Sequence, residues 1–403
     1  MAIEPLSGRS TVRLGNPCPD TVCWSDTSGV DQQELLSHGR EDRADEPARR
    51  VVRQRRWRRV WIVGAVAIAL LAASGWVGYR VALDRVKGPD VVVLPMPGGY
   101  PSGGGVAAGA VWVTVFSSGS DNPLPGSVVR VDPTTGKVVA RIRVGASPLA
   151  VADAFGSVWV SNGDGGTVTR IDPVTNRVIA TIPVGPVPYQ MAPVDGRLWV
   201  STQTSAVRLD PTNNAVDMRV KLPLPKYQEA PAQPGLGLAG DARGVWVSTA
   251  IGTVVRIRPQ DGKVVKVIRV LPDRLSSPGM VAIDGDHVWV SLFPVAGRPP
   301  YMAQYGVGAS VASISVSTGR VDQRVPTGGL PIDWILPTHQ RLYMVGNDTD
   351  TKTGVLFRSD WPYNVLTAAR GIGYGSFAIM IAGGHMWIPS FDKEALYRLP
   401  IDG

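Results

Sequence analysis

A short apolar strand with a central aromatic residue recurs seven times, and this recurrence strongly limits the folds open to the chain. The intervals between the aromatic residues run from 40 to 54 residues. The seven residues are Trp112, Trp159, Trp199, Trp246, Trp289, Tyr343 and Trp387. Such a period is typical of folds built from like units, in which each unit buries its apolar faces against its neighbours. The repeat therefore predicts an array of similar modules.

Most units also carry a turn motif and further strands, although the sixth has "FRSDWPYNVL" in place of the turn motif. Segments such as "VDPTTGKV" and "IDPVTNRV" place proline where φ is preset and Gly or Asn where a left-handed residue closes the turn. A strand opened by Pro or Gly precedes most of the aromatic strands. We expect four strands per unit and an all-β fold, a seven-bladed β-propeller. Because blades cover one another, strands such as "VIATIPV" should be buried, with the aromatic residues between the sheets.

The last unit needs a fourth strand from elsewhere in the chain. Its third strand is expected in "EALYRLPIDG", where the sequence ends. The segment "PDVVVLPMPGGYP" matches the fourth strand of other units, such as "RVIATIPVGPVP". We therefore expect residues 91–96 to pair with the last blade, which removes an open sheet edge. The propeller would then occupy residues 90–403.

The segment "IDPVTNRVIATIPVGPVP", followed by "GRLWVS", resembles the YVTN-type repeat of a β-propeller family that includes streptogramin-lyase-like domains. The resemblance spans about residues 90 to 403 and is most specific in the first four units. It implies a seven-bladed propeller that is often secreted or attached to the cell surface. It does not imply one activity, because the family includes lyase-like, sensor-like and scaffold proteins.

An arginine-rich run beside an apolar segment indicates a membrane anchor. Residues 49–59 hold seven arginines and no acidic residue, and the next twenty residues carry no charge. Twenty helical residues span roughly 30 Å, the thickness of the hydrocarbon core of a bilayer. Because the arginines precede the span, we expect a cytoplasmic N-terminus and an extracytoplasmic propeller in the cell membrane. The predicted segments are a disordered tail at 1–58, a single transmembrane helix at 59–80 and a linker at 81–89.

Two other interpretations of this region are weaker. Ala72-Ala73-Ser74 could be a signal-peptide cleavage site, but a basic region that begins after almost fifty residues is too long for an ordinary signal. The arginine run could bind nucleic acid, but its position against the apolar span is explained by membrane topology. We therefore expect the lipid bilayer, and no nucleic acid, as a partner of this region.

Ligand-binding candidates come from two long loops and from the mouth of the central channel. The loops at 222–235 and 293–310 are longer than a propeller needs, and long loops often carry function. They contain Tyr227, Tyr301 and Tyr305. At the channel mouth we place Tyr189, Gln190, Asp333, Trp334 and Tyr374. The alternative is that these five residues only line a water-filled tunnel.

No catalytic or metal-binding constellation is visible in the sequence. His287, His339 and His385 each occupy the turn before an aromatic strand of a different unit, so they cannot share a metal. The segment "NDTDTKTG" resembles a calcium loop, but a lysine stands at a ligand position. We predict a binding platform, a sensor or scaffold for an envelope component or protein partner, without cofactor or metal. The alternative is a lyase or hydrolase that acts on a small molecule at the channel mouth.

Overall fold

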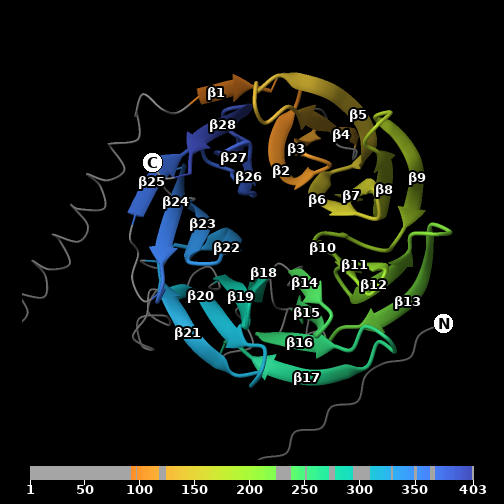
Figure 1. Ribbon diagram of the computed structural model, residues 1–403, viewed down its shortest axis with the longest axis vertical. Helices are drawn as coiled ribbons and strands as arrows, with labels where there is room; N and C mark the ends of the chain where they lie inside the picture. The colour runs from red at the N-terminus through yellow and green to blue at the C-terminus, as the bar shows by residue number, and fades with distance from the viewer. Residues whose placement is uncertain are drawn as a thin grey trace, which may run out of the picture. The chain divides into compact units, whose positions relative to one another are not determined.

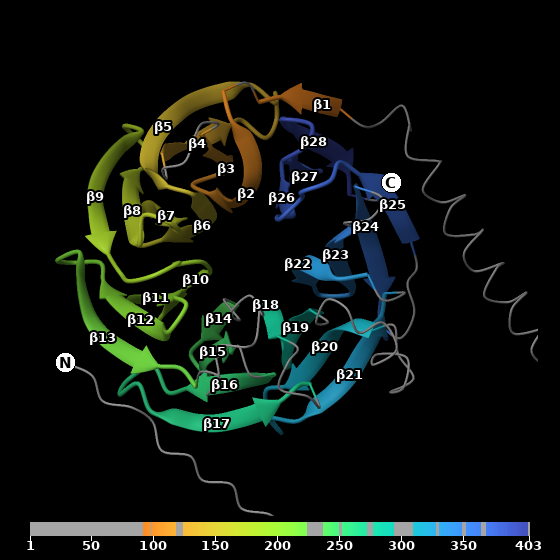
Figure 2. The same ribbon diagram turned by 180° about the vertical axis from the view of Figure 1, so that it is seen from behind.

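Seven antiparallel four-stranded sheets surround a common axis (Figures 1 and 2). The computed structural model describes residues 92–401, except 97, 118–123, 224–236, 250–251, 272–276, 294–308, 328–329, 349–351 and 364–367. Within these residues, the seven sheets account for all 28 strands. The predicted all-β, seven-bladed propeller is therefore confirmed.

Six of the blades are each built from four consecutive strands, and the first four of these blades are as follows. Blade 1 contains β2 (Tyr100–Ala107), β3 (Ala110–Phe116), β4 (Pro125–Val131) and β5 (Val138–Ala146). Blade 2 contains β6 (Pro148–Ala154), β7 (Ser157–Asn162), β8 (Thr167–Asp172) and β9 (Arg177–Pro183). Blade 3 contains β10 (Met191–Val194), β11 (Arg197–Ser201), β12 (Ser205–Asp210) and β13 (Ala215–Lys221). Blade 4 contains β14 (Leu238–Asp241), β15 (Gly244–Ser248), β16 (Thr253–Ile257) and β17 (Val264–Arg269).

The remaining blades include the one that joins the two ends of the propeller. Blade 5 contains β18 (Ser277–Asp284), β19 (His287–Phe293), β20 (Ala309–Ser315) and β21 (Val321–Pro326). Blade 6 contains β22 (Ile332–Thr338), β23 (Arg341–Asp348), β24 (Thr353–Asp360) and β25 (Ala368–Ile372). Blade 7 contains β26 (Met380–Ala382), β27 (His385–Ser390), β28 (Ala395–Pro400) and β1 (Val92–Pro95).

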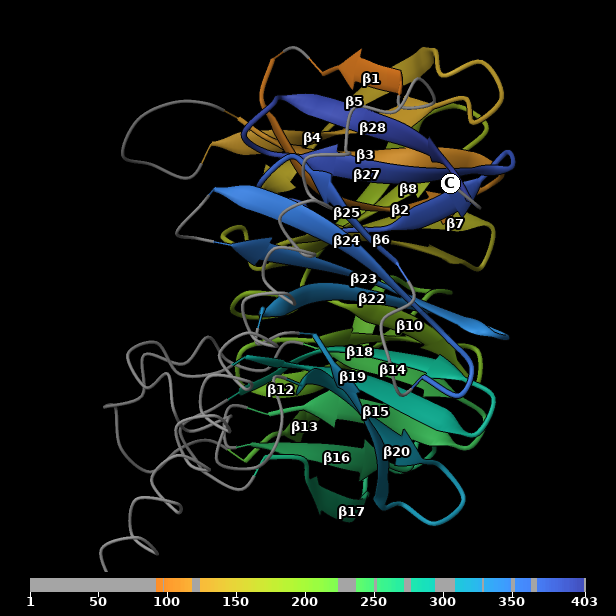
Figure 3. The same ribbon diagram turned by 90° about the vertical axis from the view of Figure 1, so that its left-hand side faces the viewer.

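The ring has two distinct faces, seen edge-on in Figure 3. In each blade the chain runs outward from the axis, and neighbouring strands are antiparallel (Figure 1). The turns after the first and third strands therefore lie at one end of the ring, which we call the turn face. The connections after the second strand and those that lead into the next blade lie at the opposite end, the loop face. The first strand of each blade, nearest the axis, begins at the loop face.

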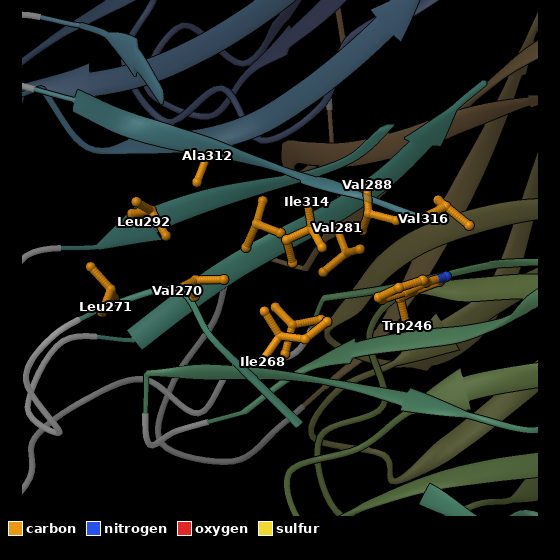
Figure 4. Packing of buried hydrophobic residues seen from close by; sticks show 12 residues of the cluster. Trp246, Ile268, Val270, Leu271, Val281, Val288, Leu292, Ala312, Ile314 and Val316 are labelled. Carbon is orange, nitrogen blue, oxygen red and sulfur yellow. The ribbon is translucent and has the colours of Figure 1, made fainter. Parts of the chain in front are cut away.

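The aromatic residues of the repeat fill the spaces between blades. Seven hydrophobic clusters are found in the described residues, and each holds one of these aromatic residues together with residues of the following blade. Trp246 of blade 4, for example, packs with Val281, Val288 and Ile314 of blade 5 (Figure 4). The six tryptophans are at most 1% exposed and Tyr343 is 3% exposed. The predicted position of the aromatic residues between the sheets is confirmed.

An arginine on the third strand ties each of several tryptophans to the next blade. Arg170 lies opposite Trp159 in the ladder, and its guanidinium carbon is 4.9 Å from the indole ring. Its Nη1 donates to the carbonyl of Pro211 at 2.6 Å and to Oδ1 of Asn214 at 2.9 Å, both in the turn of blade 3. Arginines lie over the tryptophans of five blades, namely Arg130, Arg170, Arg208, Arg256 and Arg398. Arg130, Arg170 and Arg208 also donate hydrogen bonds to the turn of the next blade.

The outer strands are less buried than the sequence suggested. We expected "VIATIPV" to be buried, but Val178 is 42% and Ile179 is 49% exposed in β9. The outer strands β5 and β17 likewise leave valines exposed, with Val139 at 53% and Val267 at 58%. The blades diverge from the axis toward the rim, so neighbouring sheets no longer cover both faces of the outermost strand. That prediction is therefore wrong for the rim of the ring.

The ring is closed by strand β1. It pairs antiparallel with β28, with Val92 opposite Arg398 and Pro95 opposite Ala395. The amide of Met96 then donates to the carbonyl of Glu394 at 2.7 Å. The Met96 side chain is 1% exposed and lies in the cluster between blades 7 and 1. The closing segment therefore contributes both ladder hydrogen bonds and buried apolar surface.

No helix among the described residues, which begin at 92, has the length and apolar character needed to span a membrane. The expected tail at 1–58, the transmembrane helix at 59–80 and the linker at 81–89 lie outside the described residues.

Deletion of residues 92–96 should abolish the cooperative unfolding of the propeller. The deletion leaves the edge of β28 unpaired and removes the buried Met96 side chain. Differential scanning calorimetry should then show a broad, low-enthalpy transition in place of a single sharp one. Val174→Ala, at a position that is 87% exposed, is the control and should keep the wild-type Tm. A deletion variant with unchanged Tm would contradict closure by this strand.

Candidate functional site

Four of the predicted ligand-binding residues converge near the axis at the loop face. Tyr189 and Gln190 directly precede β10, and Asp333 and Trp334 are the second and third residues of β22. These strands lie on opposite sides of the axis (Figure 1). Tyr189 and Trp334 pack against the same hydrophobic cluster, and the charge of Asp333 acts on Tyr189. We call these four residues the axial cluster.

Gln190 connects three blades. Its Oε1 accepts hydrogen bonds from the amide of Leu238 in blade 4 at 2.8 Å and from the amide of Val281 in blade 5 at 3.1 Å. Its own carbonyl accepts from the amide of Ser201 at 2.9 Å. First strands have one edge that faces the axis, and their amides there need acceptors. The amide oxygen of Gln190 supplies one, so this side chain has a structural task in addition to its predicted one.

Tyr189 extends from blade 3 to the opposite part of the ring. Its side chain packs against the cluster formed by blades 5 and 6, which includes Met280 and Ile335. Its amide donates to the carbonyl of Ser201 at 2.9 Å, which fixes its backbone. Burial, and to a smaller extent the negative charge of Asp333, raise the pKa of the Tyr189 phenol above its ordinary value. The hydroxyl therefore stays neutral at physiological pH.

Asp333 is held by a polar network that joins blades 6 and 7. Its Oδ2 accepts hydrogen bonds from the amide of Asn347 at 3.1 Å and from Nδ2 of Asn347 at 2.8 Å. Oδ1 of Asn347 accepts in turn from the amides of Gly375 at 2.9 Å and Ser376 at 3.2 Å. Burial raises the pKa of Asp333 to about 7, against the opposing effect of the Asn347 hydrogen bonds. The carboxyl is therefore rigidly placed and titrates near neutrality.

Trp334 and Tyr374 flank this network in different ways. Trp334 packs against three clusters, those between blades 5 and 6, 6 and 7, and 7 and 1. The Tyr374 ring lies 5.0 Å from Nζ of Lys352, and its carbonyl accepts from the amide of Asp392 at 3.3 Å. Tyr374 is thus joined to the axial cluster through its neighbour Gly375, while its ring is paired with a lysine. The other three candidates, Tyr227, Tyr301 and Tyr305, lie outside the described residues.

Asn347, which supports Asp333, was not among the residues predicted from the sequence. Its position suggested only the start of a calcium-like loop, although an asparagine after the apolar run "RLYMVG" is an unusual strand residue. Asn347 is 6% exposed, and its side chain makes four hydrogen bonds. Among the described residues, no group of His, Cys, Asp or Glu could hold a metal ion.

A second aromatic group lies on the loop face between blades 7 and 1, and it also escaped the sequence analysis. Tyr100, which opens β2, stacks on Phe391 with ring centroids 4.6 Å apart. Phe116, at the end of β3, meets the same Phe391 edge-on at 6.3 Å. All three side chains are partly exposed. Aromatic residues at this face therefore occur both near the axis and closer to the rim.

The described histidines lie at the turn face, away from the axial cluster. His287 and His385 begin β19 and β27, and His339 lies in the turn between β22 and β23. Nδ1 of His287 is 3.6 Å from Oδ2 of Asp322, and Nδ1 of His339 is 3.8 Å from Oδ1 of Asp284. The acid–histidine pair that a lyase would need at the channel mouth is not formed by the described residues.

No family model and no curated protein match the chain. Similar solved structures include one of hydrazine synthase from Kuenenia stuttgartiensis, at 15% identity and a TM-score of 0.57, covering 76% of this chain and 96% of that chain. The WD40 domain of Neurospora crassa Pan2 matches at 11% identity and a TM-score of 0.55, over 77% and 96% of the two chains. A chain of the mitotic checkpoint complex matches at 12% identity and a TM-score of 0.57, covering 77% of this chain and 93% of that chain. At these identities the similarity shows the β-propeller fold alone.

Asp333→Asn should remove a pH dependence from the stability of the chain. The folded chain keeps a proton on Asp333 that the unfolded chain releases earlier, because folding raises this pKa from 3.8 to about 7. The contribution of Asp333 to the free energy of unfolding should therefore be greatest below about pH 4 and fall as the pH rises to about 7, by up to about 4 kcal/mol. Asparagine keeps an oxygen for Asn347 and carries no charge.

Urea unfolding of wild type and Asp333→Asn at a series of pH values measures this difference. The stability of wild type relative to the variant should decline between about pH 4 and pH 7. Asp392→Asn, at a partly exposed carboxyl of the same face that pairs with Lys393, is the control and should parallel wild type. If the Asp333→Asn curve also parallels wild type across this range, Asp333 is not a buried titrating group.

Proposed function

We propose that the chain is a membrane-anchored, extracytoplasmic binding platform, a sensor or scaffold that holds a protein partner or an envelope polymer on its loop face. The observation that carries this proposal is the axial cluster. Tyr189, Asp333 and Trp334 come from opposite sides of the ring and meet at the end where the first strands begin. Partly exposed aromatic and polar groups on a rigid scaffold are typical of binding sites.

The similar structures support a binding role at the level of the fold. The Pan2 match is a WD40 domain, and the mitotic checkpoint match is a chain of a multiprotein complex. A propeller offers a preformed surface whose backbone needs no ordering on binding, and this lowers the entropic cost of association. Binding is favoured over catalysis because the described residues bring no acid–histidine pair to the axial cluster.

The anchoring part of the proposal rests on the sequence before the propeller. The uncharged segment at 60–79 is long enough to cross a bilayer, and the arginines that precede it favour a cytoplasmic N-terminus. The resemblance to YVTN-type repeats, which are often surface-attached, agrees with this topology. In the proposed arrangement the propeller stands outside the membrane, where its loop face meets envelope components.

A photo-crosslinking amino acid on the loop face should capture the partner in intact cells. Lys393, in the turn between β27 and β28, has a side chain that is 59% exposed, and Leu124, before β4, is 43% exposed. We expect p-benzoylphenylalanine at either position to give adducts of a reproducible mass. The matched control is the same amino acid at Val174, which is 87% exposed on the turn face and should give none. Equal adducts from all three positions, or adducts from Val174 alone, would refute the loop face as the binding surface.

Cysteine labelling tests the proposed topology. Val174→Cys places a thiol on the exposed turn face, and a membrane-impermeant maleimide should label it in intact cells. The two native cysteines, Cys18 and Cys23, belong to the tail that we place in the cytoplasm, so they should react only after lysis. Labelling is read as the mass shift of the cell-associated chain. Protection of Val174→Cys until lysis would show that the propeller is cytoplasmic.

A further inference from the structure

The axial carboxyl has one oxygen that the protein does not use. Oδ2 of Asp333 accepts two hydrogen bonds from Asn347, whereas no donor among the described residues bonds to Oδ1. No lysine or arginine of the described part forms an ion pair with Asp333. A partly buried carboxylate without a cationic partner is costly when ionised. The site is therefore electrostatically complementary to a cation.

Two neighbouring groups add a hydrogen-bond acceptor and an aromatic surface. The charge of Asp333 acts on the Tyr189 phenol, and within the described residues the Tyr189 hydroxyl has no hydrogen-bond partner. Trp334 follows Asp333 in β22 and packs with Tyr189 against one cluster. Indole and phenol rings attract cations through their π-faces. The three residues that carry the carboxylate, the phenol and the indole are therefore neighbours near the axis.

The network behind the carboxyl fixes its position before any ligand arrives. Asn347 holds Oδ2 with two donors and is itself held by Gly375 and by the amide and carbonyl of Ser376. Such preorganisation reduces the entropy that binding would cost. It also determines which cations fit, because only Oδ1 is left for a ligand.

We propose that the axial cluster binds a primary ammonium group, which donates hydrogen bonds to Oδ1 of Asp333 and to the hydroxyl oxygen of Tyr189, with its alkyl chain against Trp334. This inference rests on the proposed function and names the chemical group that the loop face recognises. The ammonium group can belong to a free small amine or to a lysine side chain of a polypeptide, and the experiment below separates these two sources.

The arrangement selects an ammonium group over other cations. A guanidinium binds a carboxylate through two parallel hydrogen bonds, but Oδ2 of Asp333 is occupied by Asn347. A calcium or magnesium ion needs six or more oxygen ligands, and the described residues contain no group of three acidic or histidine side chains around one point. An ammonium is a compact charge with separate donors, which suits one carboxylate oxygen and one hydroxyl.

Isothermal titration calorimetry of the purified full-length chain in detergent, with n-butylammonium chloride as the ligand, tests this proposal. We expect saturable binding at pH 8, at least about tenfold tighter than that of n-butanol, which has the same length and no charge. Tetramethylammonium, a cation without N–H donors, should bind at least about fivefold more weakly than n-butylammonium. Proton competition at Asp333, whose titratable neighbour in the cluster is Tyr189, should weaken n-butylammonium binding as the pH falls from 8 to 6.

Three variants assign the effect to the axial cluster. Asp333→Asn should weaken n-butylammonium binding about tenfold or more and abolish its pH dependence, and Tyr189→Phe should weaken it about threefold. Asp392→Asn removes another carboxyl of the loop face and should bind like wild type. Thermal unfolding verifies that each variant is folded. If Asp333→Asn does not fold, the binding by Tyr189→Phe and the pH dependence of wild-type binding test the assignment to the axial cluster. Equal binding of n-butanol and n-butylammonium, unchanged binding by the folded axial variants, or no binding by wild type overturns the proposal.

A second ligand separates the two sources of the ammonium group. A lysine-containing peptide that binds at least about tenfold more tightly than n-butylammonium indicates a polypeptide, and equal affinities indicate a small amine. Acetylation of the lysine should abolish peptide binding in either case. If ammonium binding fails while crosslinks from Lys393 and Leu124 persist, the loop face is a platform that recognises another group. If no crosslinks form while n-butylammonium binds, the ammonium site is supported and the proposed partner-binding surface is refuted.

Discussion

The packing of each repeat aromatic residue against the next blade is the interaction on which the whole molecule depends. Trp159 of blade 2 belongs to one cluster with Val200 and Val207 of blade 3, and Trp199 of blade 3 belongs to another with Val247 and Val255 of blade 4. No blade has a complete core of its own, because its apolar faces are covered by its neighbours. Stability is therefore a property of the closed ring, and a single four-stranded sheet of this kind would expose most of its apolar surface.

The first strands differ in the size of the side chains that they carry near the axis. Between blades 1 and 2, a Cβ at Gly103 would collide with the carbonyl of Leu149, and between blades 4 and 5 a Cβ at Gly237 would collide with the carbonyl of Gly279. Glycine lets these strands meet backbone to backbone. Blades 3 and 6 instead begin with Tyr189 and Asp333 at or just before the first strand. The first strands of blades 3 and 6 thus supply large and polar side chains near the axis.

The repeat made the fold predictable, since the aromatic strand, the turn and the spacing occur many times and each occurrence supports the others. The axial network was less accessible to sequence analysis. Gln190 bonds to amides of blades 4 and 5, and Asp333 depends on Asn347 and Ser376, so these contacts form only when distant segments are brought together by the ring. Residue type and strand position identified Tyr189, Gln190 and Asp333 as candidates. Their partners could not be read from local pattern, because periodicity carries no information about contacts across the axis.

The pairing of β1 with β28 has a consequence for how the propeller is made. Val92 and Arg398 are partners in the same ladder, yet about three hundred residues separate them in the chain. During synthesis the first strand of the domain therefore emerges long before its partner and stays unpaired until the last blade follows. Intermediate blades can form their local hairpins in order, but the ring stays open until β28 has been synthesised. An open ring presents unpaired strand edges, so this interval is when the nascent protein is most dependent on chaperones.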